Sequence, residues 1–214
     1  MFFDIGANVG NWALHNIKML DCNKIISVEA SPITFQTLST NIHVLNNSIK
    51  NSNKKVECLN YAVCANEGKD ITFYHCPNSN VLSTMNKKWL TDASSRFYNT
   101  PYIEIKCKTI TLDNLISTYG IPYLIKIDVE GGEFECIKSL SQKVENLCFE
   151  WASETNEITF KCLDYLVGLG FKYFFIQNED NYIFRPSNYT DVSSLKQMLL
   201  TTIPKKDWGM IWCR

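Results

Sequence analysis

The feature of this sequence that most constrains its fold is a regular alternation between short apolar runs and segments with helical spacing. Phe2–Ile5 reads as a buried strand, and residues 11–20 then keep the spacing of a helix. Residues 24–29 form a second apolar run, after which Ser31 and Pro32 supply an N-cap and a first-turn proline for another helix. Strands that alternate with helices in this way predict a doubly wound, mainly parallel α/β sheet.

The rest of the chain continues this pattern and adds one strand that is expected to run antiparallel to the others. Further strands are expected at residues 55–63, 70–75, 102–110, 123–128 and 145–151, and further helices at 112–118, 134–140 and 158–169. Residues 171–177 and 181–186 read as an antiparallel pair, which predicts one antiparallel edge strand in the sheet. The 214 residues suffice for one well-buried domain and are few for two, so we expect a single domain over residues 1–214.

Polar residues stand where several apolar runs end. In a doubly wound sheet, ligands bind beyond the carboxyl ends of the strands. That rule selects the polar residues at the ends of the expected strands, which are Asp4, Glu29, Asn60, Asp128 and Glu150. An acid costs least at a strand end and reaches a ligand best there, so these five positions outline a candidate site.

The turn after the first strand indicates which ligand this site takes. Gly6 and Gly10 permit a tight turn and a close approach of the ligand, and Glu29 suits a ribose diol. A dinucleotide fingerprint requires glycine two residues after Gly6, but Asn8 stands there, and Asp4 would repel a pyrophosphate. A ligand with a cationic amine and a ribose, but no phosphate, fits both facts. S-adenosylmethionine is such a ligand, and the same facts count against a nicotinamide oxidoreductase.

Charge and composition exclude several other classes of protein. The formal net charge is −1, with 21 basic against 22 acidic residues, and the basic runs are no longer than pairs, so we expect no nucleic-acid partner. No run approaches the roughly 18 apolar residues of a membrane span, and Asp4 interrupts the first apolar run, so we expect no membrane association and a cytoplasmic location. Nine scattered cysteines and three histidines make a zinc site improbable.

Six segments resemble the FkbM-type S-adenosylmethionine-dependent methyltransferases, within the class I methyltransferase fold. They are DIGANVGNW (4–12), VEASPITFQTLSTN (28–41), NYAV (60–63), ST (83–84), TLDNL (111–115) and IKIDVEGGEFECIKSL (125–140). The last is the most specific, because a lysine, two acids and two glycines follow one strand in the family's arrangement. The resemblance implies a seven-stranded, Rossmann-like sheet, and a hydroxyl of a sugar or glycan as the acceptor.

The resemblance and the strand-end rule together give candidate residues for each role. The candidate cofactor-binding residues are Asp4, Gly6, Ala7, Asn8, Gly10, Glu29, Ala30, Ser31, Tyr61 and Ala62. The candidate catalytic residues are Asp128 and Glu130, and the candidate substrate-binding residues are Ser83, Thr84, Trp89 and Glu150. The long polar segment 76–101 carries Trp89, Phe97 and Tyr98, which are expected either to stack on a sugar face or to anchor the segment.

Two kinds of chemistry are open for removing the proton of a hydroxyl acceptor. We expect Asp128 to act as a general base, with His75 as a weaker alternative. A divalent ion held by Asp128, Glu150 and Glu130 is possible but not favoured, because Asp-x-Glu lacks an adjacent pair of acids. Asp128 and Glu130 are also open to a purely structural interpretation, as first-turn acids that complement a helix dipole.

Two departures from the family's pattern affect what the chain does. It begins on the first strand without a helical lead-in, which suggests a domain of a longer polypeptide, and it ends in an additional aromatic tail, DWGMIWCR (207–214). The alternatives are therefore a non-catalytic S-adenosylmethionine-binding module, which would serve a fused or partner enzyme such as a glycosyltransferase, and a nucleic-acid methyltransferase. The neutral charge weakens the latter, and Asp128 with Glu130 counts against the former.

Overall fold

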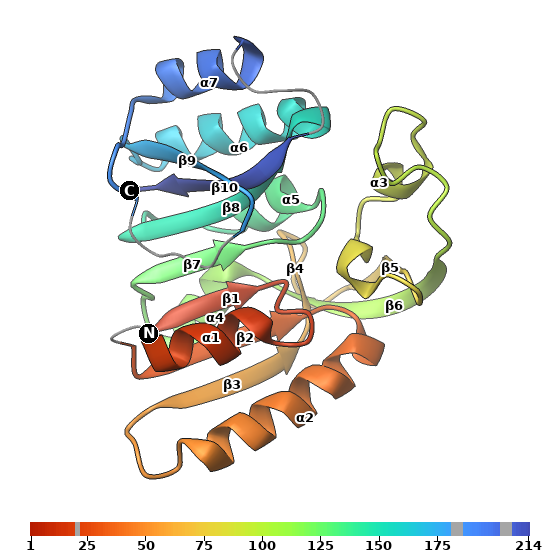
Figure 1. Ribbon diagram of the computed structural model, residues 1–214, viewed down its shortest axis with the longest axis vertical. Coiled ribbons are helices and arrows are strands. Elements are labelled where there is room, and N and C mark those ends of the chain that lie inside the picture. The colour runs from red at the N-terminus through yellow and green to blue at the C-terminus, as the bar shows by residue number, and fades with distance from the viewer. Residues whose placement is uncertain (20–21, 181–185, 202–206) are drawn as a thin grey trace.

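The main body of the protein is a seven-stranded sheet with strand order β3-β2-β1-β7-β8-β10-β9 (Figure 1). The computed structural model describes residues 1–19, 22–180, 186–201 and 207–214. Six strands of this sheet point the same way: β1 (Phe2–Ile5), β2 (Lys24–Glu29), β3 (Lys55–Asn60), β7 (Leu124–Ile127), β8 (Asn146–Ala152) and β9 (Phe174–Asn178). The predicted doubly wound, mainly parallel sheet is therefore confirmed.

The reversed strand comes from the C-terminal aromatic segment. β10 (Trp208–Cys213) runs antiparallel to both β8 and β9, so it lies one position in from the edge strand β9. The sequence suggested instead that residues 207–214 were an additional tail, and that interpretation was wrong, because five of the six β10 residues are buried within the sheet. The segment 181–186 that was expected to pair with β9 falls, up to residue 185, outside the described residues.

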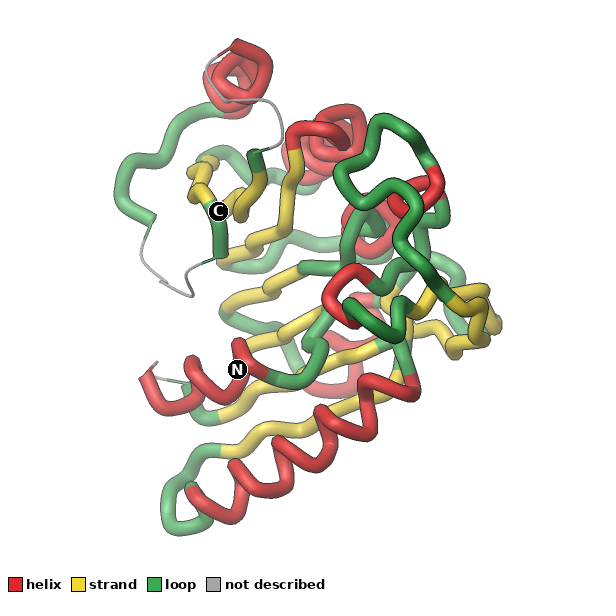
Figure 2. The backbone as a smooth tube through the Cα atoms, turned by 45° about the vertical axis from the view of Figure 1, so that its right-hand side comes forward, coloured by secondary structure: helices red, strands yellow, loops and turns green. Residues whose placement is uncertain are grey.

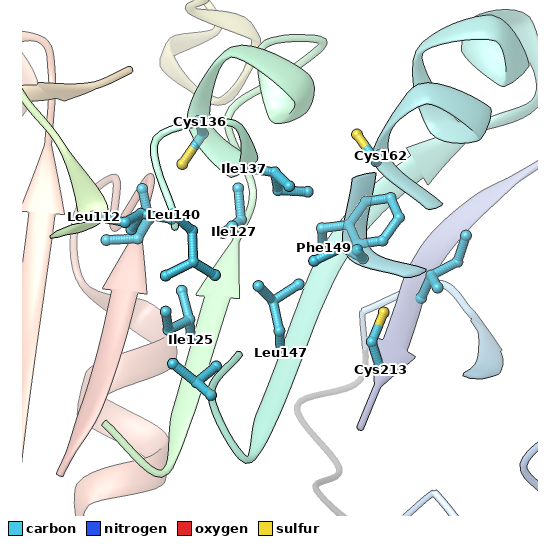
Figure 3. Close-up of a cluster of buried hydrophobic side chains, with 14 of the residues drawn as sticks. Leu112, Ile125, Ile127, Cys136, Ile137, Leu140, Leu147, Phe149, Cys162 and Cys213 are labelled. Carbon is cyan, nitrogen blue, oxygen red and sulfur yellow. The ribbon is translucent and has the colours of Figure 1, made fainter. Parts of the chain in front are cut away.

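Helices cover both faces of the main sheet. They are α1 (Asn11–Met19), α2 (Pro32–Ser48), α4 (Leu112–Tyr119), α5 (Glu133–Ile137), α6 (Asn156–Gly168) and α7 (Val192–Thr201), whereas α3 (Lys88–Thr91) lies apart from them. One buried cluster joins one face of the sheet to α1 and α2, and a larger one joins the opposite face to α4, α5, α6 and α7. Figure 3 shows part of the larger cluster, in which Leu140 and Cys136 face Ile125 and Ile127 of β7.

A second, smaller sheet stands beyond the ends of the parallel strands. The third expected strand breaks at Tyr61, so that β4 (Ala62–Val63) pairs instead with β6 (Ile103–Ile110), which in turn pairs with β5 (Asp70–His75). The segment between β5 and β6 carries two short helices, η1 (Asn80–Leu82) and α3. Figure 2 shows the loops of this segment at the right of the view, on the side of the molecule where the smaller sheet lies. We call residues 76–101 the cap segment.

Local sequence signals explain why the helices begin where they do. The Ser31 hydroxyl accepts a hydrogen bond from the Thr34 amide, so it caps α2 as the sequence predicted, and Thr111 caps α4 through the Asn114 amide in the same way. These caps fix the turns that follow β2 and precede α4. Among the helices of the described ranges, none combines the length and the apolar character that crossing a bilayer requires.

Candidate active site

A cavity of about 350 Å³ opens at the carboxyl ends of β1, β2 and β7. Most of the residues that the sequence selected line it: Gly6, Ala7, Asn8, Glu29, Ala30, Tyr61, Ala62, Ser83, Asp128 and Glu130. This volume lies within the usual range for small-molecule sites. The fold therefore brings together, in one cavity at the strand ends, residues that are more than 120 positions apart in the sequence, as the strand-end rule predicted.

The turn after β1 forms a cavity wall that leaves no room for a side chain at Gly6. Its φ is +79°, and a Cβ at this position would lie 1.7 Å from the Asp128 carbonyl oxygen. The Gly6 and Ala7 amides donate to the Val28 carbonyl, at 2.9 and 3.0 Å, which fixes the turn against β2. Asn8 also has a positive φ, of +49°, and its side-chain oxygen accepts a hydrogen bond from Asn80 of the cap segment.

Glu29 lies beside this turn at the end of β2. One carboxylate oxygen accepts a hydrogen bond from the Asn8 amide and the other from the Ser31 amide, each at 2.9 Å. Burial raises the pKa of Glu29 to about 7, although the two amide hydrogen bonds act in the opposite direction. Each carboxylate oxygen has a further lone pair, so Glu29 can also accept from two hydroxyls of a ligand.

A buried ammonium group lies among three aspartates at the opposite wall. Lys126 Nζ lies 3.0 Å from an oxygen of Asp128 and 3.9 Å from oxygens of both Asp4 and Asp180. These carboxylates raise the pKa of Lys126 despite its burial, so the lysine is charged. Asp4 is fully buried, and neither of its oxygens accepts a hydrogen bond from any residue that the structure describes. Burial raises the pKa of Asp4 to about 6, against the attraction of Lys126.

The buried carboxylate of Asp4 bears on whether the expected cofactor fits. Within the described ranges, Asp4 and Asp128 place two carboxylates beside the single ammonium group of Lys126 behind the Gly6 turn, and this negative charge favours a ligand with a cationic group. Glu29 offers acceptors for a diol, and Gly6 lets the turn after β1 pack against the Asp128 backbone, so that the two strand ends meet at the cavity. The donor and acceptor set therefore fits a ligand with a ribose and a cationic amine, the type of ligand that the sequence indicated.

A second group of acids stands beside Asp128. Asp128, Glu130 and Glu150 each present a carboxylate oxygen, and these three oxygens lie within 4.8 Å of one another, so they could hold a metal ion. Burial and the neighbouring acids raise the pKa of both Glu130 and Glu150 well above the ordinary range for glutamate. Glu150 comes from within β8 and does not itself line the cavity.

The cap segment holds the turn that carries Glu130. Thr84 donates to the Glu130 carbonyl at 2.6 Å, Asn86 donates to the Gly131 carbonyl at 3.1 Å, and the Trp89 indole donates to a Glu130 carboxylate oxygen at 3.1 Å. Glu130 has a φ of +54°, a conformation that needs such support in a residue other than glycine. These contacts make the cap segment part of the site.

Three of the predicted site residues lie behind the cavity wall and support it. A Cβ on Gly10 would lie 2.9 Å from Leu38, so this glycine allows α1 to pack closely against α2. Thr84 is completely buried. Trp89 is 4% exposed and packs edge-on against Phe97, so a sugar cannot stack on it in this conformation, and the stacking role expected of it does not hold. Its anchoring role is the one that the structure supports.

His75 occupies a buried position behind Ser83. Its Nδ1 lies 3.1 Å from the Ser31 hydroxyl and 3.4 Å from the Ser83 hydroxyl, so it links the α2 cap to the cap segment. Burial lowers the pKa of His75 and keeps the ring neutral. Because His75 does not line the cavity, its expected role as an alternative base is not supported by this arrangement.

Sequence reasoning did not select two residues that line the cavity with charged groups. Lys126 belongs to the segment 125–140 that resembles the family, but the resemblance implied no role for it. Asp180 comes two residues after the end of β9, so the strand-end rule could have found it, but it fell between the two strands expected at 171–177 and 181–186 and was given no role.

Comparisons with known proteins show which family the chain resembles. The family model described as the methyltransferase FkbM domain matches residues 4–173. A solved structure of methyltransferase FkbM from Methylobacillus flagellatus KT is similar, with a TM-score of 0.56 and 12% identity over 100% of this chain and 43% of that one. A precorrin-6y C5,15-methyltransferase from Geobacter metallireducens GS-15 gives a TM-score of 0.47 and 10% identity, over 100% of this chain and 78% of that one. No curated protein matches the chain. The chain spans less than half the length of the Methylobacillus protein.

Proposed function

The chain belongs to the FkbM methyltransferase family, and from this premise we propose that it transfers a methyl group from S-adenosylmethionine to a hydroxyl group of a sugar or glycan. The observation that carries the proposal is the cavity, which combines the Glu29 carboxylate, a tight glycine turn and the two acids Asp128 and Glu130. The choice of a sugar hydroxyl rests on the family resemblance, and it is supported by the carboxylates, which accept hydrogen bonds from hydroxyls.

Residues on three strand ends would hold the cofactor. Glu29 accepts the ribose hydroxyls while its bonds to the Asn8 and Ser31 amides keep the carboxylate in place. Tyr61, Ala62 and Phe73 supply an apolar wall for the adenine ring. When bound, S-adenosylmethionine supplies a methyl group on a sulfonium sulfur, so that transfer requires only an oxygen nucleophile in line with the methyl group and an acceptor for the hydroxyl proton.

We assign the removal of that proton to the carboxylates at the end of β7. Asp128 and Glu130 line the cavity, and the cap segment fixes Glu130 through the Trp89 indole and the Thr84 hydroxyl. A base in this position accepts the proton as the carbon–oxygen bond forms, because a sugar hydroxyl is too weak an acid to ionise beforehand. A site enclosed by the cap segment strengthens this interaction by excluding water.

A divalent ion held by Asp128, Glu130 and Glu150 is the alternative within the same reaction. The spacing of their oxygens favours it more than the sequence did, because Glu150 joins the other two in space. Such an ion would bind through oxygen ligands only, as magnesium prefers. We retain the carboxylate base as the proposal and use chelation to decide between the two.

The test is transfer of labelled methyl groups to a panel of acceptors. Purified protein is incubated with methyl-labelled S-adenosylmethionine and with mono- and oligosaccharides, nucleic acids or peptides, and products are identified by mass spectrometry. We expect label on a saccharide with wild-type protein and at least a tenfold lower rate with Glu29→Gln. Exposed Glu145→Gln serves as the matched control and should behave as wild type. Label on nucleic acid or peptide alone would contradict the assigned acceptor.

A further inference from the structure

The turn that follows β7 places Glu130 in the cavity wall in an uncommon backbone conformation. Glu130 and Gly131 have φ values of +54° and +82°, so two successive residues lie in the left-handed region. Glycine adopts this region freely, but a residue with a side chain does not, so the surroundings must hold Glu130 there. The contacts that hold it also fix where the Glu130 carboxylate lies.

Glu133, in the first turn of α5, binds the backbone amides of this turn. Its Oε1 accepts hydrogen bonds from the Val129 amide at 3.3 Å and from the Gly131 amide at 3.1 Å. Amides that converge in this way form a concave site for an anion. In this protein the chain's own side chain occupies that site, and Glu133 is 4% exposed.

The cap segment binds other polar groups of the same turn. Thr84 and Asn86 donate to carbonyl oxygens of the turn, whereas Glu133 accepts from its amides. The Trp89 indole then donates to the Glu130 carboxylate at 3.1 Å. The turn is therefore held by its carbonyls from the cap segment and by its amides from α5.

The contact depends on an acceptor oxygen at the right reach. Both amides bind the same oxygen of Glu133, and the carbonyl oxygen of a neutral carboxyl group accepts hydrogen bonds just as a carboxylate oxygen does. Burial raises the pKa of Glu133, which favours the neutral form without removing this acceptor. The length of the side chain is consequently more important than its charge.

We propose that Glu133 is a positioning residue for the methyl transfer, which keeps Glu130 in its left-handed conformation and so holds the Glu130 carboxylate in the cavity wall beside the Trp89 indole. This inference rests on the proposed function, in which Asp128 and Glu130 remove the proton of the acceptor. Without the two amide contacts, residue 130 returns to a right-handed or extended conformation, and its carboxylate leaves the position that Trp89 reaches. Glu133 does not itself line the cavity, so it acts through Glu130.

The experiment separates reach from charge with two substitutions. Glu133→Gln keeps an oxygen at the same distance from the backbone and loses the charge, whereas Glu133→Asp keeps the charge and is shorter by one methylene group. Glu135→Ala is the matched control, because Glu135 is the other acid in the first turn of α5 and pairs with Lys138.

Three properties are measured for wild type and each variant, after circular dichroism has shown that the protein is folded. The first is the exchange of the Trp89 indole hydrogen with solvent, followed by NMR in ligand-free protein and assigned with Trp89→Phe. The second is the dissociation constant of S-adenosylhomocysteine by calorimetry. The third is kcat with methyl-labelled S-adenosylmethionine and the saccharide panel.

We expect Glu133→Asp to exchange the Trp89 indole hydrogen at least about tenfold faster and to lower kcat at least about tenfold, with the dissociation constant of S-adenosylhomocysteine changed by less than about twofold. Glu133→Gln and Glu135→Ala should match wild type in all three properties. If Glu133→Asp does not fold, Glu133→Gln still decides, because a tenfold loss of kcat in that variant overturns the inference and wild-type values support it.

The outcomes separate failure of this inference from failure of the proposed function. Wild-type exchange and kcat in Glu133→Asp would overturn the inference alone, and so would a loss in Glu133→Gln that Glu133→Asp does not share, because charge would then be the requirement. Weaker binding of S-adenosylhomocysteine by Glu133→Asp would make Glu133 a support of the whole cavity, which also overturns it. Wild-type protein that binds no S-adenosylhomocysteine and transfers no methyl group would contradict the proposed function and the inference together.

Discussion

Asp4 offers a prediction in which protein stability and ligand binding change in opposite directions. Its carboxylate is fully buried and accepts no hydrogen bond in the described parts of the chain, and Lys126 Nζ lies 3.9 Å away. Burial outweighs that attraction and raises the pKa of Asp4 from 3.8 to about 6. Substitution by asparagine keeps the shape of the side chain and removes the buried charge, so we expect Asp4→Asn to stabilise the ligand-free protein at neutral pH.

The size of the expected gain in stability follows from the shift in the pKa of Asp4. A folded-state pKa above the unfolded value means that the wild type loses stability as the pH rises from below 3.8 through 6, while Asp4→Asn does not. With the pKa of Asp4 raised from 3.8 to about 6, we expect the free energy of unfolding of Asp4→Asn to exceed that of wild type by about 3 kcal/mol above pH 7 and by about 0.5 kcal/mol at pH 4. For a chain of this size, about 3 kcal/mol raises the midpoint of thermal unfolding by about 6–12 °C.

The assay is urea unfolding of ligand-free protein between pH 4 and pH 8, for wild type, Asp4→Asn and the exposed control Asp70→Asn. We expect the free energy of unfolding of Asp4→Asn to exceed that of wild type by an amount that grows with pH, while Asp70→Asn follows wild type. The same Asp4→Asn protein should bind S-adenosylhomocysteine more weakly. A variant that is less stable than wild type at pH 8, or a difference that does not depend on pH, would refute this reasoning.

Three further predictions concern the proposed cofactor and the acids. Glu29→Gln should weaken the binding of S-adenosylhomocysteine, measured by calorimetry, at least tenfold, or about 1.4 kcal/mol, because it removes the charge from the group that accepts the ribose hydroxyls. Trp89→Phe keeps the ring but removes the indole hydrogen bond to Glu130, so we expect kcat to fall about tenfold with an unchanged cofactor dissociation constant; a change in cofactor binding alone would contradict this. Asp128→Asn should lower kcat by roughly 10²–10⁴, and wild-type activity should persist in EDTA; loss in EDTA that magnesium restores would instead assign a metal ion to Asp128, Glu130 and Glu150.

The parallel part of the fold could be predicted because each strand carries its own signal. Phe2–Ile5 and Lys24–Glu29 are apolar runs bounded by a turn and a cap, and the structure gives both strands these limits. The reversed strand could not be predicted in the same way. Residues 208–213 are as apolar as the other buried strands, and the direction in which such a strand enters a sheet depends on its neighbours rather than on its own residues.

The candidate site was predictable at strand ends and much less so elsewhere. Asp4, Glu29 and Asp128 occupy the ends of neighbouring parallel strands, so topology alone brings them together. For Trp89 the sequence left open whether it stacks on a sugar face or anchors its long polar segment, and only its contacts with Phe97 and Glu130, which bury it, favour the anchoring role. Asp180 stands just beyond a strand end, but its place in the cavity also depends on the positive φ of Glu179 and on the close approach at Gly209, and neither of these has a pattern in the sequence.

The affinity of the wild-type protein for S-adenosylhomocysteine relative to NAD tests the central claim most directly. Both ligands carry an adenosine whose ribose Glu29 can bind, but only NAD carries a pyrophosphate, which Asp4 and the absence of a glycine at Asn8 disfavour. Titration calorimetry of the two ligands under identical conditions gives the ratio. We expect S-adenosylhomocysteine to bind and NAD to bind at least a hundredfold more weakly. Tighter binding of NAD would contradict the assignment of the cavity to a methyl donor.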